Sequence, residues 1–353
     1  MRFRCLVSFG ALAFAVTSIA PIPSAAQVTQ AMQVKKKAEP KPWTPALTPD
    51  GQPDLQGNWV NRSATPLERP AQLEGRQFLT DAEVVELKIR AERLFKDGHS
   101  DMPAGDDLFL AALANLEQYK RASSTADSGI MLEREFDNRT SLIVDPPDGR
   151  LPPYTPAGQR RQRAFANALS KQDPPASAED LTSFERCITW GVPMPRPGPN
   201  TSYYQIVQSP GYVVIVTEAI HGARIVPLDG RKHLPQNMRV WDGDSLGRWD
   251  GRTLVVDTTN FSPKDNFMGS AENLHLVERF TRVSPDEIRY EMTVDDLTTW
   301  TKPWTAVLRL KQTEEKLYEF ACHEGNFQVM EGMLLGARAQ EKAATEAAAK
   351  RSK

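Results

Sequence analysis

The stretch LHLVERFTRVSPDEIRYEMTVDD (residues 274–296) decides the fold of this chain. Apolar and polar residues alternate with a period of two over 274–283 and again over 288–295, and a short polar turn with Pro285 separates the two runs. A period of two places successive side chains on opposite faces of a strand. The stretch therefore predicts two neighbouring antiparallel strands with one buried face.

The same pattern continues on both sides of this pair. It predicts further strands over 204–208, 212–218, 223–228, 254–259, 304–311 and 317–322. Asp250-Gly251 is a hairpin-turn signal directly before one of them. Strands with short connections form an antiparallel meander, and closing it as a barrel or packing it as a sandwich protects its edges. We therefore expect a mainly β (α+β) fold, an antiparallel β-barrel or sandwich.

Helical signals interrupt the β pattern over about residues 80–186. Thr80 and Glu83 form a capping box before an apolar face with helical spacing, and a second helix is expected from about Asp106. Thr155-Pro156 is typical of the first turn of a third helix. We expect a single β-barrel-like domain over 54–336 that carries this helical insertion, followed by a charged helical tail at 337–353.

The N-terminal 26 residues (1–26) have the three parts of a secretory signal peptide. Arg2 and Arg4 precede an apolar run that ends at Ile19, and Ser24-Ala25-Ala26 offers small residues for cleavage. The apolar run is shorter than the ~20 residues of a membrane span. Residues 27–53 are rich in Pro and Lys and predict a linker. We expect an exported protein, periplasmic or extracellular, with no integral membrane segment after signal removal.

Composition narrows the class of protein further. The 353 residues carry 43 Lys+Arg against 45 Asp+Glu, a net charge of -2, which lacks the basic surplus of a nucleic-acid-binding protein. The sequence contains no phosphate-binding loop, so we expect neither a nucleic-acid partner nor a nucleotide cofactor. Removal of Cys5 with the signal leaves Cys187 and Cys322. In an oxidising compartment these two would most simply form a disulfide, and two buried free thiols are the alternative.

Several segments resemble a family of exported bacterial proteins without an assigned activity. They are GDSLGRWDGRTLVVDTTNF (243–261), LVERF (276–280), YEMTVD (290–295), WTKPW (300–304) and YEFACHEGN (318–326). Upstream, Gly57-x-Trp59 is similar to the strand opener of lipocalin-type barrels. The resemblance implies an exported location and a lipocalin-like β fold, and it implies no activity.

The segment Gly243-Asp244-Ser245-Leu246-Gly247 fits the G-x-S-x-G pattern of a nucleophile elbow. An elbow presents its serine between a strand and a following helix. Here the residues that follow predict a hairpin and a strand, so we expect a turn that leads into the hairpin and no serine esterase.

The histidines suggest acid–base or metal chemistry. His221 and His233 lie in loops on either side of one predicted strand, and His323 ends the last predicted strand beside Glu324, with Glu319 on the same face. If the loops converge at one end of the barrel, these five residues are candidate catalytic groups. The three histidines would then also be candidate ligands for a divalent metal with an open coordination position. Ordinary hydrogen-bonded or surface histidines are the alternative, and His275 is interpreted in that way.

Charged residues follow one face of the predicted strands. Glu278, Glu291 and Arg309 belong to this face, and Val277 and Tyr290 belong to the opposite one. The charged face is either solvated above a packed core or turned into a polar barrel interior that holds a ligand. In the second case the three charged residues would bind the substrate.

The tryptophans carry a related hypothesis. Trp249, Trp300 and Trp304 would stack on a ring of a ligand or anchor the core, and Trp304 joins the three charged residues as a substrate-binding candidate.

These features predict an exported protein that acts on a small organic or carbohydrate-like molecule in a barrel pocket. Hydrolysis, elimination and isomerisation with His/Glu acid–base or metal chemistry are all compatible with the candidate residues. A non-catalytic, lipocalin-like binder of an apolar small molecule is the alternative, as is a structural envelope protein. Convergent titratable groups in the pocket would favour the enzyme, and an apolar lining would favour the binder.

Overall fold

The structure, a computed structural model, describes residues 43–96, 107–113, 134–169, 175–191, 202–264 and 266–351. The predicted signal peptide (1–26) and the linker residues before Trp43 lie outside this part of the chain. Residues 43–53, the rest of the predicted linker, form a turn that a backbone hydrogen bond from Asp54 N to Ala46 O closes. Defined structure therefore starts ahead of the predicted domain boundary at residue 54.

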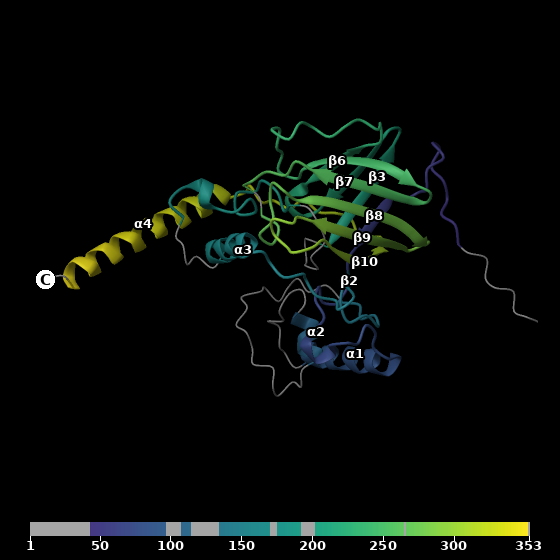
Figure 1. Ribbon diagram of the computed structural model, residues 1–353, viewed down its shortest axis with the longest axis horizontal. Coiled ribbons are helices and arrows are strands. Elements are labelled where there is room, and N and C mark those ends of the chain that lie inside the picture. The colour runs from purple at the N-terminus through teal and green to yellow at the C-terminus, as the bar shows by residue number, and fades with distance from the viewer. Residues whose placement is uncertain are drawn as a thin grey trace, which may run out of the picture. The chain divides into compact units, whose positions relative to one another are not determined.

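Ten antiparallel strands form a single sheet in the described part of the chain (Figure 1). Nine of them are hydrogen-bonded in the order β5-β4-β3-β1-β10-β9-β8-β7-β6. Their bounds are β1 (Gly57–Val60), β3 (Tyr203–Ser209), β4 (Tyr212–Thr217), β5 (Ala223–Pro227), β6 (Asp244–Asp250), β7 (Thr253–Thr259), β8 (His275–Ser284), β9 (Glu287–Asp295) and β10 (Trp304–Gln312). The tenth, β2 (Ile143–Asp145), pairs with the first residues of β10.

The two edges of this sheet, β5 and β6, come close together and nearly close it into a barrel. Gly247 on β6 allows this approach: a Cβ atom there would lie 2.6 Å from Leu228 Cδ2 and 2.8 Å from Val226 Cγ1. The edges meet through these side chains without pairing through backbone hydrogen bonds, and we call this region the seam. The expected mainly β fold is confirmed, with the barrel as its architecture.

Large apolar side chains fill the barrel interior. Phe280 on β8 lies opposite Tyr290 on β9, and Trp304 on β10 lies opposite Val294. These side chains are buried, together with Leu55, Trp59, Tyr204, Ile206, Val213, Ile215, Val226, Leu254, Val256, Leu276, Ile288, Met292, Ala306, Leu308 and Leu310. Because every second residue of a strand faces inward, the alternation that predicts the strands also supplies the core.

Trp59 closes one end of the barrel. Its indole Nε1 donates a hydrogen bond of 2.9 Å to the carbonyl of Leu55, and the ring is completely buried. The Arg282 guanidinium lies over this ring, 5.2 Å from its centroid, and donates to the carbonyl oxygens of Asp54 and Pro285. This end of the barrel is consistent with the predicted likeness of Gly57-x-Trp59 to the lipocalin strand opener.

Four α-helices accompany the sheet in the described ranges: α1 (Asp81–Lys96), α2 (Asp107–Leu113), α3 (Pro156–Leu169) and α4 (Asn326–Arg351). The predicted capping box is present, because Thr80 N donates to Glu83 Oε2 and Glu83 N donates to Thr80 Oγ1. Helices α1 and α2 share a small hydrophobic cluster of their own, in which Leu87 and Phe109 are buried.

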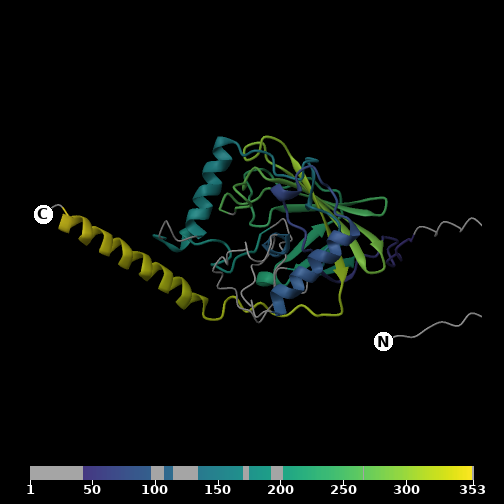
Figure 2. The same cartoon turned by 90° about the horizontal axis from the view of Figure 1, so that it is seen from below.

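Helix α3 packs directly on the loop before β10 (Figure 2). Arg161 Nε donates to the carbonyl of Gly269, and its Nη2 donates to Thr299 Oγ1. At Gly158, in the first turn of α3, a Cβ atom would lie 2.3 Å from the carbonyl oxygen of Thr299. Only glycine therefore allows the helix to approach this loop so closely.

We expect the same substitution to have opposite effects in two helices. Gly158→Ala should lower the free energy of unfolding by about 1–3 kcal/mol, because the added methyl group overlaps the backbone of Thr299. Gly336→Ala in α4, where a Cβ atom would meet nothing within 4 Å, should raise it by up to about 1 kcal/mol through helix propensity. Denaturant titration of both variants checks this, and equal effects of the two would contradict the packing of α3.

The predicted strand over 317–322 is absent. Residues 313–325 contain no strand, Tyr318 is 74 % exposed, and α4 begins at Asn326, well before the predicted tail at 337. The physical reason lies in β1, whose Trp59 pairs with Gln312 and occupies the edge of β10 that a further strand would need. The charged residues from 337 onward form the C-terminal part of α4.

The segment Gly243–Gly247 has a structural role. Its residues from Asp244 onward belong to β6, which forms the predicted hairpin with β7 through Gly251 and Arg252. The Ser245 hydroxyl is buried and shares a hydrogen bond of 2.9 Å with Thr258 Oγ1. A strand surrounds this serine where an elbow needs a following helix, so the segment is not a nucleophile elbow.

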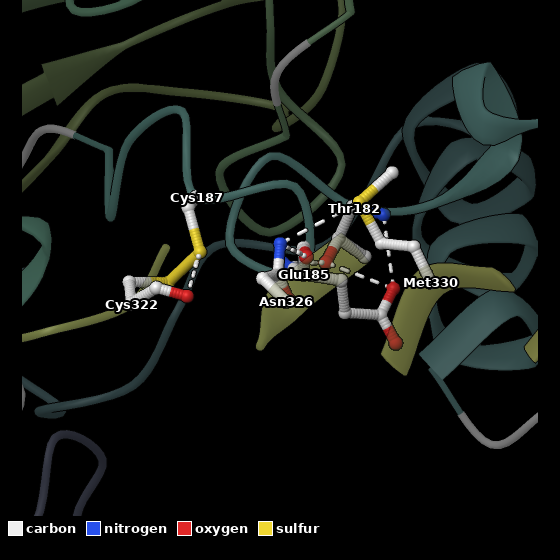
Figure 3. Close-up of a disulfide and its surroundings, with 6 residues drawn as sticks. All are labelled: Thr182, Glu185, Cys187, Cys322, Asn326 and Met330. Atoms are coloured by element: carbon white, nitrogen blue, oxygen red, sulfur yellow. Dashed lines mark hydrogen bonds between the residues drawn. A yellow bond between two sulfur atoms is a disulfide. The ribbon is translucent and has the colours of Figure 1, made fainter. Parts of the chain in front are cut away.

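The predicted disulfide between Cys187 and Cys322 is present (Figure 3). It joins the segment before β3 to the turn before α4, across a sequence separation of 135 residues. Beside it, Asn326 Nδ2 donates to the carbonyl of Glu185, so the start of α4 is held to this segment twice. A formed disulfide fits an oxidising compartment.

Removal of this disulfide should destabilise the barrel. We expect Cys187→Ser combined with Cys322→Ser to lower the free energy of unfolding by roughly 2–5 kcal/mol, because the unfolded chain is freed from a long closed loop. Denaturant titration with and without reductant measures the effect. The reductant should destabilise the native protein and leave the double variant unchanged, and a native protein indifferent to reductant would contradict the prediction.

Candidate functional site

A buried ion pair crosses the barrel interior at the end opposite Trp59. Arg224 on β5 donates from Nη1 to Glu278 Oε2 (2.6 Å) and from Nη2 to Glu278 Oε1 (2.9 Å). The Tyr290 hydroxyl on β9 donates to the same Oε1 at 2.9 Å. Glu278 is 0 % exposed and the Arg224 side chain 12 %. One carboxylate is thus held by a guanidinium and a phenol inside the barrel.

The strand registers explain why these polar groups face inward. Arg224 lies opposite Ile215 on β4, and Glu278 lies opposite Met292 on β9, both of them core residues. The prediction that Val277 belongs to the core face is therefore wrong, and of the two orientations left open for Glu278 the inward one is observed. On β8 the buried row is Leu276, Glu278 and Phe280.

Burial and charge fix the protonation states of this cluster. Burial disfavours the Arg224 cation, but the adjacent Glu278 carboxylate outweighs that effect and the pKa of Arg224 is raised. Burial, reinforced by Glu278, also raises the pKa of Tyr290 well above its ordinary value. The cluster therefore contains a permanent guanidinium cation and a neutral phenol whose O–H donates a hydrogen bond to the carboxylate.

A buried ion pair of this kind contributes little net free energy to folding. Desolvation of two charges offsets most of their attraction, and well-packed apolar residues in their place are often equally stable or more so. Buried charges that border a cavity are therefore candidates for a ligand site.

Arg224 lines a small cavity of about 30 Å³ at this end of the barrel, which we call the mouth cavity. Thr189, Trp190 and Gly191 form one wall, and Asp242 lies on the rim, where it accepts a hydrogen bond of 2.5 Å from Thr189 Oγ1. The wall follows Cys187 directly in the chain, so the disulfide anchors it. The cavity combines a cation, a carboxylate and an indole ring.

A second polar cluster lies on the outer face of β6, β7 and β8. The two ring nitrogens of His233 contact Asp244 Oδ2 (3.0 Å) and Asp257 Oδ1 (3.1 Å). His275 Nε2 contacts the same Asp257 Oδ1 at 3.1 Å. Asp244 also accepts hydrogen bonds from Arg231 and from the backbone N–H of Leu234. We call this set the His–Asp cluster, and it fastens the loop after β5 to the barrel wall.

Hydrogen bonds set the charges in the His–Asp cluster. The bond from His275 lowers the pKa of Asp257, and the same bond raises the pKa of His275 above 6.5. Burial alone would raise the pKa of Asp244, but the bonds led by that from Arg231 outweigh it and lower this pKa. Two ionised carboxylates therefore face two imidazole rings.

Stability should depend on pH through His275. Because its pKa is raised in the folded protein, the stabilisation is fully present below about pH 6.5 and is lost as pH rises through the raised pKa. We expect His275→Asn to remove this decrease in the free energy of unfolding at high pH. The decrease should be at most about 1 kcal/mol, because the side chain is partly exposed. Denaturant titration near pH 6 and near pH 9 checks it. Asp257→Asn should act likewise, and an unchanged pH dependence in both variants would refute the assignment.

The structure separates the predicted catalytic residues. His233 belongs to the His–Asp cluster, whereas Glu319, His323 and Glu324 are exposed in the segment between β10 and α4. Because no strand forms there, the predicted shared face of Glu319 and His323 does not exist. His221 ends a short 3₁₀ turn, and its side chain lies outside the described part of the structure.

The structure also separates the predicted substrate-binding residues. Glu291 and Arg309 lie on the outer face of the barrel, where they contact Arg289 and Glu287 respectively. The expectation that they share a face with Glu278 is therefore wrong. Trp304 is completely buried and packs against Trp300 as a core anchor.

Among the described side chains, no group of three His, Cys, Asp or Glu residues is arranged to hold a metal ion. The pairing that does form, His233 and His275 around Asp257, uses a histidine that the sequence interpretation treats as structural or exposed.

Arg224 and Asp257 are the residues that sequence reasoning missed. The available signal was Glu278 itself, since a charge between Leu276 and Phe280 on an apolar face requires a partner of opposite charge. Arg224 occupies the corresponding position on β5, two residues before the buried Val226.

The chain is thus a nearly closed antiparallel β-barrel protein whose mouth cavity is lined by charged residues. No family model matches the chain, and no curated protein matches it either. In the ranges that the structure describes, every helix is too short or too polar to cross a membrane.

Proposed function

We propose that this chain is an exported protein that binds a small organic molecule with a carboxylate group at the mouth cavity. The observation that carries the proposal is the buried Arg224–Glu278 pair, whose arginine is one of the residues that line that cavity. The disulfide supports an exported location, because such bonds persist in oxidising compartments.

Arg224 has the chemistry of a carboxylate anchor. A guanidinium has five N–H donors, and the fork to Glu278 uses one on each terminal nitrogen. The donors that remain are held in a fixed orientation at the cavity, where a ligand carboxylate would accept them. Glu278 and Tyr290 thus position Arg224, and little side-chain entropy remains to be lost when a ligand binds.

The rest of the cavity restricts the class of ligand. Asp242 would repel a second carboxylate near it and would accept a hydrogen bond from a hydroxyl or amino group. Trp190, which is 36 % exposed, offers an apolar surface to the remainder of the molecule. A cavity of about 30 Å³ holds only the polar head of such a ligand. Small hydroxy acids and amino acids satisfy these conditions.

Binding is better supported than catalysis. Both oxygens of Glu278 are already engaged by Arg224 and Tyr290, so this carboxylate is poorly placed to take a proton from a substrate. The hydrolase, lyase and isomerase alternatives would need a second titratable group beside a bound ligand, and Asp242 is the candidate that lines the cavity.

Calorimetric titration with lactate, glycine and the neutral control lactamide tests the proposal. We expect the acids to bind and lactamide not to bind. Arg224→Lys keeps the positive charge opposite Glu278 but loses the fork, and it should weaken binding at least tenfold. Arg309→Gln on the outer face is the matched control and should bind as the native protein does.

Two further variants distinguish a loss of the binding site from a loss of folding. The double variant Arg224→Gln/Glu278→Gln leaves no unpaired buried charge, so it should fold and fail to bind. Trp190→Phe should retain binding. Equal binding of lactate and lactamide, or undiminished binding by the double variant, would overturn the proposal.

A further inference from the structure

A cavity opens at the seam at the opposite end of β5 from Arg224. It is a cavity of about 280 Å³, which we call the seam cavity. Its walls come from the turn over 48–52, the hairpin between β3 and β4, Leu228 after β5, and Arg248 and Trp249 at the end of β6. Four separate parts of the chain therefore meet around one space.

The walls of the seam cavity are held in place by the chain itself. Gln208 accepts a hydrogen bond from Leu55 N and donates one to the carbonyl of Pro53, which fastens the N-terminal segment to β3. Thr48 N donates to the carbonyl of Gln52 and closes the turn that forms the rim. The cavity is thus built before any ligand arrives.

An aromatic and a polar surface face each other across the seam cavity. Trp249 packs against the core with part of its ring and lines the cavity with the rest, and Tyr212 is 44 % exposed beside it. Asp50, Gln52 and Arg248 supply a carboxylate, an amide and a guanidinium. One carboxylate and one guanidinium leave the lining without an excess of charge.

We propose that the seam cavity binds a neutral, polyhydroxylated molecule, a carbohydrate unit. Hydroxyl groups both donate and accept, so they can pair with Asp50, Gln52 and Arg248 together. The C–H face of a sugar ring is apolar and fits against the flat rings of Trp249 and Tyr212. An apolar ligand would leave the polar lining unpaired, and the balanced charges offer no preference for an anion.

This site is independent of the mouth cavity. No lining residue is common to the two, and their ligands differ in charge. A sugar should therefore bind whether or not lactate binds, so failure of one proposal leaves the other intact.

Saturation-transfer NMR and calorimetry with glucose, maltose and cellobiose test the site on the disulfide-bonded protein. We expect at least one of these sugars to bind at millimolar concentration. Trp249→Phe keeps a flat ring at the cavity, so it should bind within about twofold of the native protein. Trp249→Leu, without a flat ring, should weaken it more than tenfold.

Surface variants keep the test valid if Trp249 proves necessary for folding. Asp50→Ala lies in a turn outside the core and should weaken binding without lowering the melting temperature. Arg309→Gln on the outer face should bind as the native protein does. No binding of any of the three sugars at tens of millimolar would overturn the proposal, as would equal binding by the native protein, Asp50→Ala and Trp249→Leu.

Discussion

The ion pair between Arg224 and Glu278 ties an edge strand of the sheet to the far wall of the barrel. Burial of either charge without the other would cost several kcal/mol. Strands β5 and β8 must therefore stay close enough for the Arg224 and Glu278 side chains to form hydrogen bonds across the interior. This requirement supports the curl of the sheet that brings β5 to β6, where Arg224 lines the mouth cavity. Closure of the barrel and construction of the site therefore depend on the same contact.

Much of the fold follows from local patterns. The alternation over 274–296 and its short polar turn predicted β8 and β9 within a residue or two, and Thr80 and Glu83 marked the start of α1. The alternation of apolar and polar residues gave a wrong prediction where the pairing of strands decides whether a strand forms. Residues 317–322 alternate like a strand but find the edge of β10 occupied by β1, which is distant in sequence. The predicted hairpin indicated only the end of β6, because Gly247, which lets this strand approach the seam, interrupts the apolar–polar alternation.

The candidate site was predictable only in part, for a related reason. Glu278 and His233 stand out in the sequence as polar residues near apolar strands, and both belong to polar clusters of the structure. Their partners Arg224 and Asp257 depend on strand register and on the curvature of the sheet, which no local spacing encodes. The predicted grouping of His323 with Glu319 relied on a strand that does not form.

The seam also determines where the polypeptide can be interrupted. The strands β1 to β5 precede the loop between β5 and β6, and β6 to β10 follow it, while the two strands that flank the loop share no backbone pairing. A proteolytic nick there would leave every ladder intact. Cys187 lies on one side of the nick and Cys322 on the other, so the two fragments would stay covalently joined. A nicked barrel would therefore consist of two chains that are joined by the disulfide and keep the same strand pairing.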